Sequence, residues 1–262
     1  MQSQNKYYST GFRKEISSTH TWRTIDNCMG FMVPYIRGTE SILDVGCGPG
    51  TITIDCARKY LEAKVVGIDT LEELANVGKK VASEQGLSNV KFEVGSVMSL
   101  PYDDESFDIV YVHQLLLHLP EPIGALKEMT RVVKPGGLIF AREADLDSTI
   151  VYPMEYESIK YFFNHFALGE STDTTGGRKL KEWALESGTE AKNIVMSSST
   201  QYYSSVEERK QHRRMYAERL RKSKEGASDK YTVKQIEDSW ELWEKDERSL
   251  FVMIMSEIVI RV

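Results

Sequence analysis

Short apolar runs alternate with amphipathic segments through roughly the first half of the chain. The runs predict buried strands, and the segments between them carry apolar residues at helical spacing. The predicted strands cover residues 42–45, 64–68, 90–94, 107–112 and 138–143. The predicted helices cover residues 50–60, 71–86 and 121–133. Strands that alternate with helices in this order form parallel βαβ units with right-handed crossovers.

The second half of the chain has longer polar segments with helical spacing. Helices are predicted at residues 154–168, 176–187, 205–223 and 232–247, and strands at 193–203 and 250–262. The last strand is rich in β-branched residues, so we expect it to return to the sheet after a helical insertion. The chain shows no internal repeat, low-complexity tract or Pro-rich linker, which favours a single domain.

Composition and charge narrow the class of protein. The 262 residues are 41% hydrophobic and 27% charged, which is typical of a globular chain. With 33 basic and 39 acidic residues the formal charge is −6, which argues against a globally basic nucleic-acid binder. Three cysteines, Cys28, Cys47 and Cys56, do not form a disulfide framework and fit a reducing compartment. Without an apolar N-terminal segment or a long apolar run, a cytoplasmic protein without a membrane span is expected.

A glycine cluster follows the first predicted strand, in the sequence DVGCGPG of residues 44–50. Glycines at such a strand-to-helix turn allow a tight bend and let a ligand approach the backbone. Asp69 closes the second strand, 19 residues after Gly50, where an acid can accept hydrogen bonds from both hydroxyls of a ribose. The third glycine comes one residue early for a dinucleotide fingerprint, whose position Thr51 holds.

Three stretches together resemble the class I S-adenosylmethionine (SAM) methyltransferases. They are LDVGCGPG with the later Asp69, SFDIVYVHQLLLHL at 106–119, and RVVKPGGLIFARE at 131–143. The subgroup resembled is the ubiquinone/menaquinone-biosynthesis type, or type 11. Weaker similarity, in residues 20–36, 145–153 and 176–188 and in the C-terminal segment, connects the chain to a branch that includes fungal gliotoxin-type bis-thiomethyltransferases.

The resemblance implies an α/β, Rossmann-like fold and an enzyme that uses SAM. The sheet would have seven mostly parallel strands, an antiparallel last strand and a helical cap above its carboxyl edge. The chain would then divide into an N-terminal lid segment (1–40), a SAM-binding core (41–145), a cap and substrate region (146–249) and the final strand (250–262). The cap would be built from the insertions at about 147–175 and 204–247.

The resemblance also implies which residues contact SAM. This set comprises Gly46, Cys47, Gly48, Gly50, Asp69, Thr70, Ser96, Val97, His113, Gln114 and Tyr8. One position departs from the family pattern, because the loop after the third strand reads Gly95-Ser96 where Gly-Asp is usual. Ser96 or the backbone of Val97 would have to replace that carboxylate near the adenine. No metal site is expected.

Methyl transfer from a sulfonium is an in-line displacement, in which the protein mainly supplies position and a dry cleft. A general base matters when the nucleophile is protonated at working pH, so a thiol with a pKa of about 8.5 demands less than a phenol near 10. His113, just past the fourth strand, is the candidate base, although it could simply be a polar residue that begins a helix. His118 is assigned a structural role. Glu143, Asp145 and Asp147 could orient a substrate or hold a proton, or be solvated loop carboxylates.

The acceptor is expected to be a small organic molecule. Asp145, Tyr152, Phe166 and Trp240 are candidates for its binding site, although aromatic residues at helical spacing serve equally well as core. The basic run 207–224 suggests an RNA or protein methyltransferase as an alternative, but a solvated amphipathic helix explains it more simply. A SAM-binding module without catalysis is the third reading. We expect a monomer that binds no nucleic acid.

Overall fold

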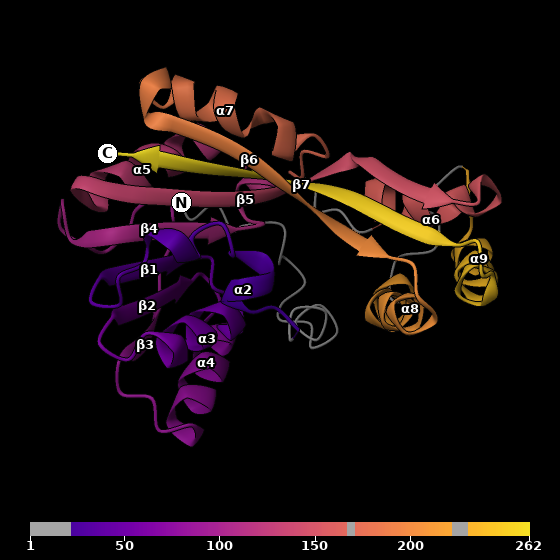
Figure 1. The fold of residues 1–262 in the computed structure, drawn as a ribbon, viewed down its shortest axis with the longest axis horizontal. Helices are drawn as coiled ribbons and strands as arrows, with labels where there is room; N and C mark the ends of the chain where they lie inside the picture. Colours follow the sequence, from indigo (N-terminus) through magenta and orange to yellow (C-terminus); the bar gives the residue numbers. More distant parts are fainter. Residues whose placement is uncertain (1–21, 167–170, 222–229) are drawn as a thin grey trace.

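A computed structural model of the protein describes residues 22–166, 171–221 and 230–262. Its centre is one seven-stranded sheet with strand order β3-β2-β1-β4-β5-β7-β6 (Figure 1). The strands are β1 Ser41–Val45, β2 Lys64–Asp69, β3 Val90–Val94, β4 Phe107–His113, β5 Val133–Tyr152, β6 Ile194–Tyr203 and β7 Leu250–Arg261. The first five pair in parallel, and β7 runs antiparallel to both β5 and β6. The predicted α/β class and the antiparallel final strand are confirmed.

Helices cover both faces of the sheet. One face carries α2 Ile25–Cys28, α3 Thr51–Lys59 and α4 Glu72–Glu84, and the other carries α5 Pro122–Val132 and α7 Gly176–Glu186. Alternating side chains of β4 show the division, because Tyr111 packs in the first layer and Val110 in the second. Burial on both faces explains why the central strands read as continuous apolar runs in the sequence.

Strand β5 is much longer than residues 138–143, over which the sequence predicts it. It spans 20 residues and pairs with β7 from Leu138 opposite Arg261 to Tyr152 opposite Leu250, with an irregularity between Asp145 and Ile150. Residues 147–152, expected in the helical cap, therefore continue the strand. Figure 1 shows β5, β7 and β6 extending together out of the sheet toward α6, α8 and α9.

The cap packs on this extension of the three strands. It contains α6 Glu157–Tyr161, α8 Val206–Arg221 and α9 Val233–Lys245. The helix predicted at 154–168 is divided into a 3-10 turn (Met154–Tyr156), α6 and a π-helical turn (Phe162–Phe166), and its last two residues lie outside the described part. Further 3-10 turns lie at Val33–Tyr35, Leu116–His118 and Ala191–Asn193. The cap core is mostly aromatic and includes Phe162, Phe163, Trp240, Trp243 and Phe251.

Two arginines of the basic helix α8 contact α9. Arg209 is only 2% exposed, and its guanidinium donates to the carbonyl of Glu244 (3.1 Å) and to that of Ser204. Arg213 forms an ion pair with the carboxylate of Glu244 (3.0 Å). Cations at the last turn of a helix stabilise its unpaired carbonyls and its dipole. Among the helices that the structure describes, none is long and apolar enough to cross a membrane.

The ring of Phe92 on β3 is enclosed by three glycines. A Cβ atom on Gly78 of α4 would come within 2.6 Å of this ring, one on Gly67 of β2 within 2.9 Å, and one on Gly50 would also collide with it. The third glycine of the 44–50 loop thus makes room for a core side chain. This packing fixes the start of α3 against β2 and β3.

We expect Gly78→Ala to destabilise the protein although it improves helix propensity. Alanine gains about 1 kcal/mol over glycine within a helix, whereas overpacking a core costs about 1–3 kcal/mol. A net loss of about 1 kcal/mol in the free energy of unfolding should appear in urea denaturation. In a Phe92→Leu background the same substitution should cost less, and a stabilising Gly78→Ala in the native background would contradict this packing.

Candidate functional site

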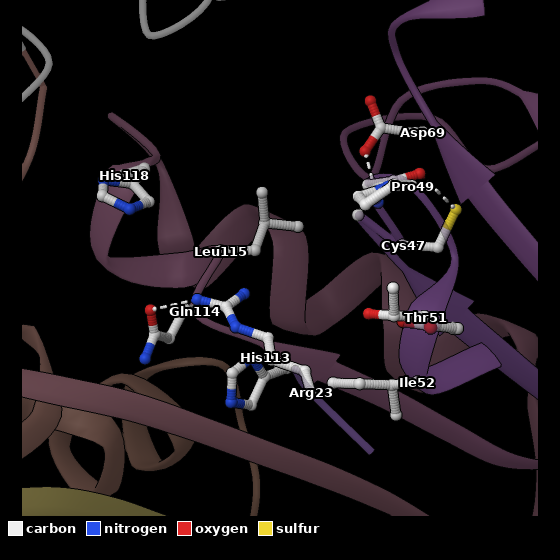
Figure 2. A pocket seen from close by; sticks show the side chains of 13 residues that line it. Arg23, Cys47, Pro49, Thr51, Ile52, Asp69, His113, Gln114, Leu115 and His118 are labelled. Carbon is white, nitrogen blue, oxygen red and sulfur yellow. Dashed lines mark hydrogen bonds between the residues drawn. The ribbon is translucent and has the colours of Figure 1, made fainter. Parts of the chain in front are cut away.

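A cleft opens at the carboxyl ends of β1, β2 and β4. Its empty volume is ≈ 620 Å³, which includes the part that is open to solvent. Open α/β sheets bind ligands at this edge, where the strand order reverses. The cleft lies between the glycine loop, the segment after β4 and the residue Arg23 (Figure 2). Its lining comprises Arg23, Asp44, Gly46, Cys47, Gly48, Pro49, Thr51, Ile52, Asp69, His113, Gln114, Leu115 and His118.

The glycine loop is held against the end of β2. The amides of Gly46 and Cys47 both donate to the carbonyl of Ile68, at 2.8 and 3.0 Å. Gly46 and Gly48 have φ angles of 71° and 56°, in the left-handed region that favours glycine. A Cβ atom on Gly48 would meet nothing within 4 Å, so a ligand can approach the backbone at this point.

Asp69 ends β2 beside this loop and is 7% exposed. Its Oδ2 accepts the amide of Gly48 (2.9 Å) and its Oδ1 accepts the amide of Leu71 (3.0 Å). Burial raises the pKa of Asp69, and these backbone hydrogen bonds oppose that effect. A carboxylate has about four acceptor positions, so capacity remains for hydroxyl groups of a ligand.

Asp44 is a functional candidate that the sequence analysis did not single out. It is buried at the floor of the cleft, where its Oδ2 accepts hydrogen bonds from Thr53 (2.5 Å) and from Tyr111 (2.7 Å). Burial raises the pKa of Asp44 to about 7. The signal in the sequence was an acid within the apolar run ILDV.

The segment after β4 forms the opposite wall. Gln114 has a φ of 53°, which is uncommon for a residue with a side chain and is typical of functional sites. Its amide donates to the carbonyl of Arg142 (2.9 Å), and its Oε1 accepts from Nη2 of Arg23 (3.1 Å). Arg23 thereby brings a cation into the cleft. Arg23 lies within residues 20–36, which carry the weaker family similarity, but nothing in that segment marks the arginine as a site residue.

The carboxylate of Glu143 holds the turn that follows Gln114. Its Oε1 accepts the amides of Leu115 (3.0 Å) and Leu116 (2.8 Å), while Oε2 has no partner among the described residues. Burial raises the pKa of Glu143 to about 7. The three acids expected in a loop after the fifth strand all lie within β5, and of them Glu143 positions the cleft wall.

Two histidines line the cleft. His113 is 7% exposed, and its Nε2 lies 3.1 Å from Nη1 of Arg142. His118 has its Nδ1 2.9 Å from Oγ1 of Thr172, and burial lowers its pKa to about 3. His118 is therefore neutral at physiological pH.

The structure gathers part of the expected cofactor set. The residues at the cleft are Gly46, Cys47, Gly48, Asp69, His113 and Gln114. Four other expected residues, Gly50, Thr70, Ser96 and Val97, are not among the residues that line the cleft. Gly50 packs on Phe92, Thr70 is exposed, and Val97 is buried. The hydroxyl of Ser96 accepts the amide of Met98 (3.2 Å). Burial raises the pKa of the Cys47 thiol well above its usual range, consistent with a packing role. Tyr8 lies outside the described residues.

The expected substrate residues are not brought to this cleft. Asp145 forms a two-pronged ion pair with Arg178 (2.5 and 2.7 Å), which ties β5 to α7. Tyr152 is 48% exposed on the extension of β5, and Trp240 is 1% exposed because it packs in the cap core. The side chain of Phe166 lies outside the described part. Among the residues that the structure describes, no group of three or more His, Cys, Asp or Glu could hold a metal ion.

Comparisons with known proteins agree with this geometry. Residues 36–221 match the family model described as a methyltransferase domain. An uncharacterized methyltransferase of Schizosaccharomyces pombe is 37% identical over 265 residues, with 97% of this chain and 95% of that protein covered. A demethylmenaquinone methyltransferase of Bacillus cereus (strain ATCC 10987 / NRS 248) is 40% identical over 128 residues, which are 48% of this chain and 53% of that protein.

A solved structure shows the same fold at lower identity. The geranyl diphosphate C-methyltransferase of Streptomyces coelicolor A3(2), in complex with Mg²⁺, geranyl diphosphate and S-adenosyl-L-homocysteine, superposes with a TM-score of 0.51 at 15% identity. The match covers 89% of this chain and 78% of that one.

The chain belongs to the methyltransferase domain family and is a class I SAM-dependent methyltransferase. The described cleft fits this cofactor. The space around the Cβ position of Gly48 is open, and the nearby Asp69 has acceptor positions to spare. These are the two features that a nucleoside ribose requires at the end of β2.

Asp69→Ala should weaken SAM binding at least about 10-fold, because charge-assisted hydrogen bonds contribute about 1.5–3 kcal/mol each. Isothermal titration calorimetry measures the dissociation constant directly. Asp103→Ala, which removes an exposed carboxylate outside the cleft lining, is the matched control and should bind normally. An unchanged dissociation constant for Asp69→Ala would show that this carboxylate does not hold the ribose.

Gly48→Val should abolish SAM binding by filling the open side of the loop. Valine at a positive φ is strained, so Gly86→Val serves as a control for strain alone. Gly86 has a φ of 67° and equally open space around its Cβ position, but it lies outside the cleft lining. We expect similar losses of thermal stability in both variants and loss of SAM binding in Gly48→Val alone. Equal SAM affinity in the two variants would argue against a cofactor at Gly48.

Proposed function

We propose that this enzyme transfers the methyl group of SAM to a small organic molecule, of the thiol-bearing or aromatic secondary-metabolite kind. The observation that carries the proposal is the contact between the cleft and the cap. Nε2 of Gln114, which lines the cleft, lies 4.0 Å from Sδ of Met255, which belongs to the aromatic cap core. An acceptor that enters beside Gln114 would meet an apolar, aromatic lobe, and such surroundings suit a compact apolar molecule.

Different residues of the cleft would bind different parts of SAM. Asp69 and the open backbone at Gly48 would hold the ribose, and the Arg23 guanidinium suits the carboxylate end of the cofactor. When bound, SAM supplies an electrophilic methyl group. The chain positions the acceptor, excludes water and keeps the glycine loop rigid through the hydrogen bonds to Ile68.

Structural observations disfavour an RNA-binding role for the basic run. Within the described part of α8, Arg209 is buried on α9, Arg213 pairs with Glu244, and Lys210 pairs with Glu207 at 2.8 Å. Arg209 and Arg213 are engaged within the cap, and Lys210 pairs with an exposed acid of its own helix, so these three cations offer little charge to a phosphate backbone. The amphipathic-helix interpretation of the run is the one we adopt.

Transfer of labelled methyl groups across thiols, phenols, quinols and amines tests the proposal. We expect incorporation into at least one small acceptor, with little dependence on salt and with loss of incorporation in Asp69→Ala. Incorporation into RNA or protein alone, with strong salt sensitivity, would favour the rival macromolecular role. SAM binding with no transfer to any acceptor would favour a non-catalytic module.

A further inference from the structure

A row of polar side chains crosses four strands beside the cleft. In the strand registers His113 of β4 lies opposite Arg142 of β5, Arg142 opposite Glu257 of β7, and Glu257 opposite Ser197 of β6. The sheet therefore brings an imidazole, a guanidinium, a carboxylate and a hydroxyl into one line. His113 is the member of this row that lines the cleft.

The interior of the row is buried and extensively hydrogen-bonded. Arg142 is 3% exposed and Glu257 is 6% exposed. Oε1 of Glu257 receives Nε of Arg142 (3.3 Å) and the hydroxyl of Ser199 (2.6 Å), and Oε2 receives the hydroxyl of Ser197 (2.8 Å). Nη2 of Arg142 donates to the Ser199 oxygen (3.0 Å). These contacts fix the guanidinium so that its Nη1 is directed at Nε2 of His113.

This contact determines where the imidazole carries its proton. A guanidinium has only hydrogen-bond donors and stays charged in proteins. Nε2 of His113 must then accept the hydrogen bond with its lone pair, which leaves the proton of the neutral ring on Nδ1. A proton on Nε2 would place two N–H groups against each other at 3.1 Å.

We propose that Arg142 is a positioning residue that holds His113 as the Nδ1–H tautomer, so that the ring acts at the cleft as a hydrogen-bond donor and not as a general base. This replaces the base role expected from the sequence. The consequence for catalysis, which rests on the proposed function, is an acceptor that loses its proton without His113. A thiol meets that condition more readily than a phenol.

The tautomer can be measured without any activity. Uniformly ¹⁵N-labelled histidine in the full chain gives long-range ¹H–¹⁵N correlations for each ring, and the His113 signals are those missing from a His113→Gln spectrum. In the wild-type protein we expect a protonated, pyrrole-type Nδ1 and an unprotonated, pyridine-type Nε2. A pyrrole-type Nε2 in the wild-type protein would overturn the proposal, whatever the enzyme methylates.

Two variants assign the effect to Arg142. The double variant Arg142→Met/Glu257→Met exchanges the buried ion pair for apolar side chains of similar size, an exchange that proteins often tolerate. Its His113 signals should move to the average of two tautomers. Glu257→Gln keeps the guanidinium in place and should retain the wild-type pattern. Unchanged signals in the double variant, or an equal change in Glu257→Gln, would show that Arg142 does not select the tautomer.

Kinetics with a competent acceptor then separate a donor from a base. Glutamine can donate a hydrogen bond but cannot take up a proton at neutral pH. His113→Gln should therefore keep its kcat within about 10-fold of the wild-type value, whereas loss of a general base lowers the rate about 10²–10⁴-fold. An equal and large loss of kcat in His113→Gln and His113→Ala, with SAM affinity intact, would restore the base role.

Discussion

The antiparallel pairing of β5 with β7 is the constraint on which the rest of the molecule depends. It runs from Leu138 opposite Arg261 to Tyr152 opposite Leu250, so the same ladder begins beside β4 and ends under the cap. Paired backbone groups satisfy each other's hydrogen bonds, so the two strands extend together past the carboxyl edge of their neighbours. The cap core is therefore attached to the same strands that place Arg142 and Glu257 beside the cleft.

The cleft is built from buried polar groups that are held by specific partners. Asp44, Asp69 and Glu143 each accept hydrogen bonds from loop amides or from hydroxyls, and for each of them burial raises the pKa. Such groups cost desolvation energy, and their hydrogen bonds offset part of it. These hydrogen bonds fix the shape of the cleft, because the glycine loop, the end of β2 and the turn after β4 are each held by at least one carboxylate.

Methyl-group chemistry asks the protein for position more than for reactive side chains. The two cleft histidines agree with that demand, because His118 is kept neutral by burial and His113 is engaged by Arg142. Arg23 in the cleft and Arg142 behind His113 both come from outside the glycine loop, one from the N-terminal segment and one from β5. The charge distribution of the site thus depends on segments that are distant in the sequence.

The sequence by itself determined the order of strands and helices and the place of the glycine loop. It could do so because apolar periodicity and glycine spacing are local properties, and residues 44–50 and 69 carry their meaning within one βαβ unit. The tertiary structure alone decided the length of β5, the packing of Trp240 in the cap, the capture of Asp145 by Arg178 and the contact of Arg142 with His113. These features arise from pairing between strands and from burial among residues that are distant in the sequence. Local spacing does not predict which of these residues will come into contact.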